Sequence, residues 1–277
     1  MENDEALRQW NSAAAGWTKW EHIHNKALAP ATQIMLDRAG VTVGSRVVDI
    51  ACGAGDQTLA AARRAGPGGH VLATDISPLM LEFVAEQAKA GGLGNIVTHA
   101  CPAEMLPRDQ RPFDAAICRL GLMLLPDPPA AVAAVREVLR PGGRFGALVI
   151  GPPAANPAHS EPIAILRRHA GKPAPVSGPG LFALADTAKL KSLFLDAGFA
   201  DVIVTSEDSF FSLDSSEDMI RMIQEAFGAV RGIIGDQPAA VQDAAWAEVR
   251  GAIARFETGD GFKAPCQFHV VSGRKAG

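Results

Sequence analysis

The stretch VVDIACGAGDQTLAAA, residues 47–62, constrains the fold of this chain most strongly. A run of β-branched residues ends near Asp49, glycines follow at positions 53 and 55, and an alanine-rich helical pattern comes next. Strand, glycine loop and helix in this order form the first unit of a nucleotide-binding parallel sheet. The sequence therefore predicts an α/β protein with a nucleotide site at this loop.

The same alternation of strand and helix patterns continues along the chain. Helical patterns of about ten to fifteen residues separate the apolar runs, which predicts right-handed βαβ units. We expect a Rossmann-like, doubly wound, seven-stranded, mostly parallel sheet with helices on both faces. The predicted strands are 45–51, 69–77, 95–101, 113–123, 144–151, 200–207 and 266–275.

Two segments are not required by this sheet. Residues 1–40 have helical spacing and carry Trp10, Trp17 and Trp20, so we expect a helical cap packed on the core or over a ligand pocket. Within the main domain, residues 41–277, a mostly helical insert is predicted at about 208–260. We expect the cap helices and this insert to form a lid.

Bulk composition excludes several classes of protein. The 277 residues carry a formal net charge of −4 and no run of Lys or Arg, unlike a nucleic-acid-binding protein. No apolar run reaches the roughly 18 residues of a membrane span, and the polar N-terminus is unlike a signal peptide. We therefore expect a cytoplasmic protein that acts on a small molecule.

Cysteine and tyrosine usage narrows the chemistry further. The four cysteines form no CxxC pair, so we expect reduced thiols and no metal site. The chain has no tyrosine, which excludes the Tyr/Lys mechanism of short-chain dehydrogenases. The cysteines are Cys52, Cys101, Cys118 and Cys266.

Two acidic residues indicate which nucleotide the loop holds. Asp75 ends the second predicted strand, 20 residues after Gly55, where a carboxylate can accept hydrogen bonds from both ribose hydroxyls. Asp49 is expected to face the ligand, repelling a pyrophosphate and attracting a cation. Thr58 replaces the third glycine of the dinucleotide pattern. S-adenosylmethionine has the required ribose and cation, and an NAD(P)-dependent oxidoreductase is the less favoured alternative.

Several motifs resemble a known family. VVDIACGAG, VLATDIS, PAEMLP, FDAAICRLGLMLLPDP and VREVLRPGGRF occur in the order and spacing of class I S-adenosylmethionine-dependent methyltransferases, most closely the UbiE-like branch of ubiquinone and menaquinone biosynthesis. The resemblance covers about residues 10–206. It implies S-adenosylmethionine as cofactor, S-adenosylhomocysteine as product, and a homodimer as one option for the assembly.

The resemblance also implies roles for individual residues. It assigns the methionine part of the cofactor to Asp49, Gly53 and Gly55, with backbone contacts from Ala51 and Cys52. It assigns the ribose to Asp75, the adenine faces to Ile76 and Met80, the adenine edge to Ala103 and Glu104, and the methionine carboxylate or pocket mouth to Arg119, followed by Leu120.

One position departs from the family pattern. Pro102 stands where the family usually has an aspartate that accepts from the adenine amino group. Proline has neither a side-chain acceptor nor an N–H group. Glu104 or a backbone carbonyl is expected to accept this hydrogen bond, or affinity falls by a few-fold to about tenfold.

The expected activity is methyl transfer by in-line displacement to a small apolar acceptor, aromatic or quinonoid or polyketide-like. The apolar face of residues 219–234 motivates this acceptor class. His22 and His24, in the N-terminal segment that covers the site in this family, are the candidate general bases; His159 and His169 are weaker candidates. A methyltransferase fold that binds the cofactor without methyl transfer remains an alternative.

Overall fold

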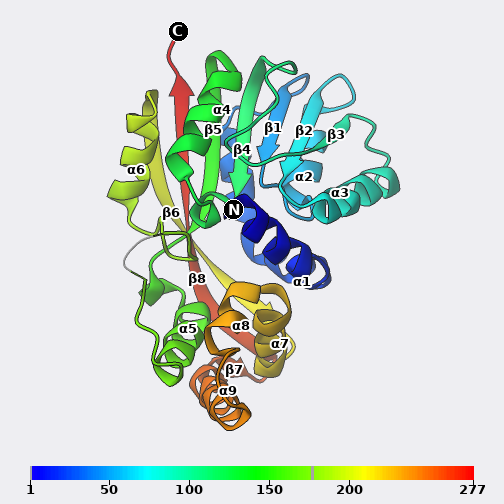
Figure 1. Cartoon of the computed structure of the whole chain (residues 1–277). Helices are drawn as coiled ribbons and strands as arrows, with labels where there is room; N and C mark the ends of the chain where they lie inside the picture. The colour runs from blue at the N-terminus through cyan, green and yellow to red at the C-terminus, as the bar shows by residue number, and fades with distance from the viewer. Residues whose placement is uncertain (1, 176–177) are drawn as a thin grey trace.

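The chain folds around one mixed sheet (Figure 1). The computed structural model describes residues 2–175 and 178–277. The strand order is β3-β2-β1-β4-β5-β8-β6, and the short β7 pairs with β8. The strands are β1 (Arg46–Ile50), β2 (His70–Asp75), β3 (Ile96–Ala100), β4 (Phe113–Arg119), β5 (Leu139–Ile150), β6 (Phe199–Leu213), β7 (Glu257–Thr258) and β8 (Gly261–Lys275).

The sheet confirms the predicted Rossmann-like fold. Strands β1 to β5 pair in parallel, and β8 runs antiparallel to both β5 and β6. All seven predicted strands are present, and the two-residue β7 is added to them. The central strands are buried on both faces, as helices on either side require.

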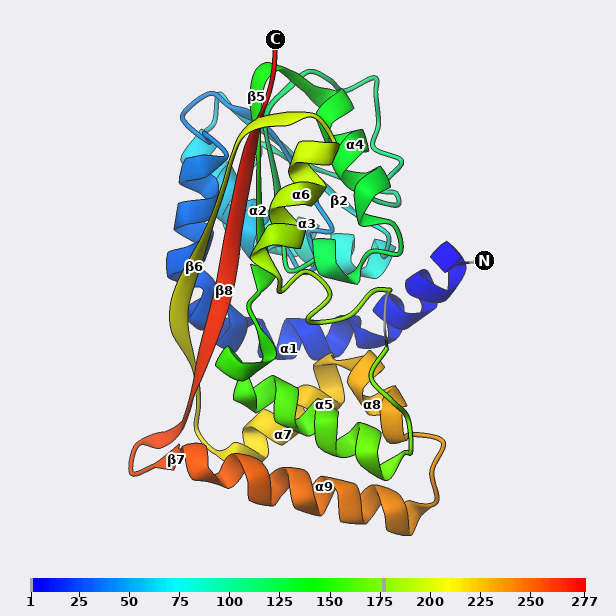
Figure 2. The same ribbon diagram turned by 90° about the vertical axis from the view of Figure 1, so that its left-hand side faces the viewer.

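Helices cover both faces of the sheet, with α2 on one side and α4 and α6 on the other (Figure 2). The main helices are α1 (Glu2–Arg38), α2 (Asp56–Ala65), α3 (Pro78–Ala90), α4 (Pro128–Val138), α5 (Pro157–His169), α6 (Thr187–Asp196), α7 (Ser216–Ala226), α8 (Gly228–Ile234) and α9 (Ala239–Ile253). Three 3₁₀ turns are η1 (Leu122–Leu124), η2 (Pro153–Ala155) and η3 (Ala254–Phe256).

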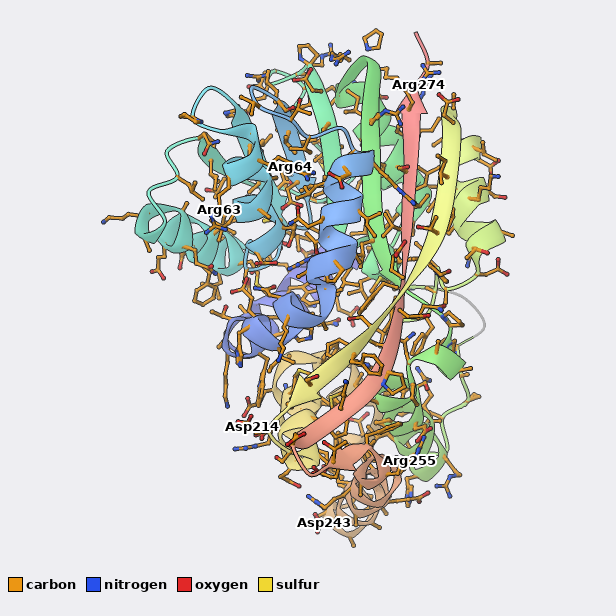
Figure 3. All side chains as sticks on the ribbon, turned by 180° about the vertical axis from the view of Figure 1, so that it is seen from behind. Arg63, Arg64, Asp214, Asp243, Arg255 and Arg274 are labelled. Atoms are coloured by element: carbon orange, nitrogen blue, oxygen red, sulfur yellow. The ribbon has the colours of Figure 1, made fainter. Side chains whose placement is uncertain are left out.

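Strands β6 and β8 are longer than the sequence predicted. They remain paired from Phe199↔Lys275 to Leu213↔Phe262. Residues 208–213, expected in the helical insert, therefore belong to a strand; their exposure alternates from one residue to the next, as in a half-buried strand. The two strands extend beyond the rest of the sheet and lead to the lower helices (Figure 3). In that view Arg274 lies at the upper end of β8 and Asp214 just after β6 at the lower end.

The helices α5, α7, α8 and α9 pack on one another and form a layer below the sheet, which we call the helical layer. The sequence assigned the N-terminal cap and the later helical insert to a lid, whereas α5 also belongs to this layer. Helix α7 buries one apolar face, comprising Met219, Ile220, Met222, Ile223 and Ala226.

Helix α1 lies between the sheet and the helical layer (Figure 2). The sequence predicted a cap of helices over residues 1–40, and the structure has one 37-residue helix, α1, that continues through Pro30. Proline lacks one helical hydrogen bond, and burial of the neighbouring Leu28, Ala31 and Met35 compensates for the loss. Because α1 contacts both the sheet and the helical layer, it forms the roof of any pocket at the lower edge of the sheet.

Candidate functional site

The glycine loop after β1 contains residues with positive φ angles, a backbone conformation that residues with side chains rarely adopt. Gly53 and Gly55 have φ angles of 56° and 100°, and Ala51 has a φ of 51°. A Cβ atom on Gly55 would lie 2.8 Å from Val84 Cγ2. Gly55 is thus required by its backbone conformation and by the close approach of α3.

Asp49 lies behind this loop, which corrects the prediction that its carboxylate faces the ligand. The residue is fully buried and is absent from the pocket wall. Its Oδ2 accepts from Thr58 Oγ1 at 2.5 Å, and its Oδ1 lies 3.4 Å from Gln57 Nε2. Burial raises the pKa of Asp49 to about 7, against the effect of these hydrogen bonds. Thr58, which replaces the third glycine, thus turns the carboxylate towards α2.

Asp75 occupies the position expected of a ribose-binding carboxylate. It ends β2, lines the pocket, and is 8% exposed. Its Oδ2 accepts from the Gly53 N–H at 3.0 Å and its Oδ1 from the Ser77 N–H at 2.9 Å. Burial raises the pKa of Asp75, while these N–H groups favour the ionised form. Each carboxylate oxygen has further acceptor capacity for a ligand hydroxyl.

One large pocket lies where the glycine loop, the end of β2 and α1 meet. The empty space in it is about 1040 Å³, which includes solvent at its open mouth. The wall includes eleven of the twelve residues predicted to bind cofactor, Asp49 being the exception. These eleven are Ala51, Cys52, Gly53, Gly55, Asp75, Ile76, Met80, Ala103, Glu104, Arg119 and Leu120.

Arg119 connects the sheet to the roof of the pocket. Its Nη1 donates to Asp56 Oδ2 at 2.6 Å and to Thr32 Oγ1 at 3.3 Å, and its Nη2 donates to Asn25 Oδ1 at 3.1 Å. The side chain is only 8% exposed. Arg119 is therefore held in place at the pocket wall before any ligand binds.

The segment around Pro102 forms another part of the wall. Cys101, Pro102, Ala103 and Glu104 all line the pocket. The carbonyl of Pro102 accepts from the Met105 N–H at 2.9 Å, closing a turn. The turn thus presents backbone and the Glu104 side chain where the family usually has an aspartate.

The two predicted histidines differ in their surroundings. His22 is exposed and absent from the pocket wall, because it lies on the outer side of α1; the prediction that it acts in the site is not supported. His24 is buried and lines the pocket. Its Nδ1 lies 3.0 Å from the Trp20 carbonyl oxygen, and burial lowers its pKa to about 4.

The other histidines are held elsewhere. His269 bridges Ser206 Oγ and the Ala185 carbonyl, at 2.9 and 3.0 Å. His169 contacts Glu248 on the surface, 2.8 Å between Nε2 and Oε2. His159 is buried in α5, and burial lowers its pKa to about 3.

The middle of the chain matches a known domain family. Residues 47–143 match the family described as a methyltransferase domain. They contain β1 to β4 and the glycine loop, with Asp75 and Arg119. Residues 47–143 are a methyltransferase domain of the class I fold.

Relatives of this methyltransferase domain are named for a C-methyltransferase. The ubiquinone/menaquinone biosynthesis C-methyltransferase UbiE of Bordetella avium is 40% identical over 110 residues, covering 40% of this chain and 43% of the relative. That of Pasteurella multocida is 36% identical over 123 residues, covering 44% and 46%. The matched region thus spans less than half the length of each of these two relatives.

Solved structures share the fold over most of the chain. YcgJ from Bacillus subtilis has a TM-score of 0.59 at 20% identity, covering 90% of this chain and 99% of that one. A [4+2]-cyclase, SpnF, has a TM-score of 0.56 at 21% identity, covering 89% and 80%. At these identities the similarity concerns the fold alone.

Sequence reasoning missed most of the roof over the methyltransferase domain. Of the three tryptophans predicted on the core or over a pocket, Trp10 and Trp17 line this pocket, whereas Trp20 is buried and donates to Glu225. Glu21, Asn25 and Leu28 of the same helix join Trp10 and Trp17 in the wall but were not predicted there. Their spacing of three to seven residues places them on one helical face, which was the available signal. In the part of the chain that the structure describes, no cluster of His, Cys, Asp and Glu could hold a metal ion, and no helix is long and apolar enough to cross a membrane.

Proposed function

We propose that this chain binds S-adenosylmethionine in the pocket under α1 and transfers its methyl group to a small apolar acceptor. The observation that carries the proposal is Asp75, which lines the same pocket as the glycine loop and keeps acceptor capacity on both oxygens. The domain match over residues 47–143 and the UbiE relatives support the same activity.

The charges of the pocket wall favour a cationic ligand. Three carboxylates line it, those of Glu21, Asp75 and Glu104, against one guanidinium, Arg119, which is paired with Asp56. This balance attracts a sulfonium and an ammonium group and repels a pyrophosphate. Although Asp49 is absent from the pocket wall, the excess of carboxylates there disfavours an NAD(P)-dependent oxidoreductase.

In the proposed reaction the residues hold the two reactants in line and exclude water. The acceptor attacks the methyl carbon, the carbon–sulfur bond breaks, and neutral S-adenosylhomocysteine leaves. If the acceptor carries an O–H group, its proton passes to Nε2 of His24, which carries the lone pair because Nδ1 lies on the Trp20 carbonyl oxygen. An aromatic or quinonoid acceptor agrees with the aromatic roof and with the names of the UbiE relatives.

Calorimetric titration with S-adenosylmethionine, S-adenosylhomocysteine and NADH tests the cofactor. Micromolar binding of both adenosyl ligands and none of NADH is expected. Formation of S-adenosylhomocysteine is then followed with a panel of hydroxylated aromatic acceptors. Tight cofactor binding without turnover would favour the non-methylating alternative, and failure of both adenosyl ligands to bind would reject the proposal.

A further inference from the structure

Five rings meet where α1 contacts the helical layer, and we call this cluster the aromatic junction: Trp17, His24, His159, Phe211 and Phe227. The two histidines come from α1 and α5 and contact the same two phenylalanines. His24 lies 5.8 Å from both Phe211 and Phe227, and His159 lies 4.8 and 5.7 Å from them, between ring centroids. The Trp17 ring lies tilted against both His24 and Phe227, 4.6 and 5.4 Å away between ring centroids.

Three buried polar atoms of the aromatic junction lack a hydrogen-bond partner: Trp17 Nε1, His24 Nε2 and His159 Nδ1. Buried polar atoms in native proteins are nearly all paired, because leaving one unpaired costs about 1–3 kcal/mol. Only five buried side-chain atoms are unpaired among the residues that the structure describes, and three of them are in this cluster. Such a concentration indicates a place completed by another molecule.

The hydrogen-bonding roles of two of these atoms can be assigned. A carbonyl oxygen can only accept, so His24 Nδ1 must carry the proton that it donates to Trp20, 3.0 Å away. His24 Nε2 therefore has a lone pair and accepts. Trp17 Nε1 can only donate. An acceptor and a donor on neighbouring rings complement a hydroxyl group, which both donates and accepts.

Trp17 and His24 also line the pocket that contains Asp75 and the glycine loop. The remaining rings of the junction support them from the helical layer. Phe227 lies at the corner between α7 and α8, where its ψ of 70° is non-helical.

We propose that the aromatic junction is the acceptor subsite, and that it selects a planar ring bearing a hydroxyl group, as in a phenol or enol. The ring lies against Trp17 and His24 on the pocket side. Its O–H donates to His24 Nε2, and Trp17 Nε1–H donates to its oxygen. His159 lies behind them and contributes the third unpaired polar atom of the cluster, Nδ1. This inference rests on the proposed function, since the same pocket must hold the cofactor.

Binding of matched ligands to the protein saturated with S-adenosylhomocysteine tests the proposal. The probes are mono- and bicyclic phenols, each paired with its methyl ether, and binding is followed by calorimetry. The wild type is expected to bind the phenols about tenfold more tightly than the ethers, because the ethers cannot donate to His24. In His24→Phe this preference is expected to disappear while S-adenosylhomocysteine affinity is retained.

His22→Phe is the matched control, because His22 is exposed on the same helix and absent from the pocket wall. It should keep the phenol preference. Trp17→Phe keeps a ring and removes the donor, so it should weaken binding of phenols and ethers alike; it tests the subsite if His24→Phe does not fold.

Equal affinity for phenols and ethers in the wild type would overturn the proposal, as would a preference that survives in His24→Phe. Failure of every probe to bind the saturated protein would also overturn it. Failure of S-adenosylhomocysteine itself to bind would instead reject the proposed function, so the two failures are distinguishable.

Discussion

The two walls of the pocket satisfy their polar groups differently. On the sheet side, both oxygens of Asp75 accept backbone N–H groups, and Asp49 is hydrogen-bonded by α2. On the roof side, Trp17 Nε1 and His24 Nε2 have no partner. The comparison teaches that the sheet wall is already organised for its ligand, whereas the roof wall is incomplete without one.

The largest effect is expected at the sheet wall. Asp75→Ala removes two hydrogen bonds between a charged acceptor and the ribose, each worth about 1.5–3 kcal/mol. Affinity for S-adenosylhomocysteine should fall at least about 100-fold, measured by calorimetry. Asp243→Ala, on the exposed part of α9 (Figure 3), is the control and should bind normally. A loss below about fivefold in Asp75→Ala would show that the ribose binds elsewhere.

At the roof wall, buried neutral histidines make stability depend on pH. Unfolding returns His24 from a pKa of about 4 to its ordinary 6.5, so between these values the unfolded chain binds a proton that the folded chain does not. The contribution of His24 to the free energy of unfolding is therefore complete above pH 6.5 and is lost as pH falls towards 4. Because the pKa of Asp49 is raised on folding, its contribution to the free energy of unfolding changes with pH in the opposite direction.

Because of these opposing signs, wild type and His24→Phe are compared at each pH by urea unfolding. Between pH 7 and 4 the wild type should lose up to about 3 kcal/mol more than the variant. If the free energies of unfolding of the wild type and of His24→Phe changed with pH in parallel, His24 would be in contact with solvent in the folded protein.

The contact between α1 and the helical layer depends on a glycine. A Cβ on Gly16 of α1 would lie 2.1 Å from the Glu225 carbonyl oxygen of α7. Gly16→Ala should therefore cost about 1–3 kcal/mol by forcing the helices apart, measured by urea unfolding. Gly251→Ala, in α9 with nothing within 4 Å, should instead stabilise by about 0.5–1 kcal/mol. Equal changes in the two variants would argue against close packing of α1 on α7.

A smaller effect distinguishes Asp75, in the sheet wall, from Asp49, which lies behind that wall. Thr58→Val removes the hydroxyl that donates to Asp49 and should cost about 1–2 kcal/mol of stability, while Thr58→Ser should cost less. Neither should change S-adenosylhomocysteine affinity more than about threefold, since Asp49 is absent from the pocket wall. A large loss of affinity with unchanged stability would instead indicate that Asp49 contacts the ligand.

Local sequence signals predicted the sheet wall well. The glycine spacing and the place of Asp75 at a strand end follow from short-range rules, and the family resemblance implied the other residues of the eleven that line one pocket. The depth of Asp49 was not predictable from its strand, because it depends on the hydroxyl of Thr58 nine residues later. The aromatic junction was still harder to predict from the sequence, because its rings come from four separate segments: α1, α5, β6 and the α7–α8 corner.

The most direct test of the account is a crystal structure of the protein with S-adenosylhomocysteine. The account predicts both ribose hydroxyls within about 3 Å of the Asp75 carboxylate, and Asp49 still bound to Thr58 and out of contact with the ligand. A ligand whose ribose lies away from Asp75, or whose amino group contacts Asp49 directly, would contradict it.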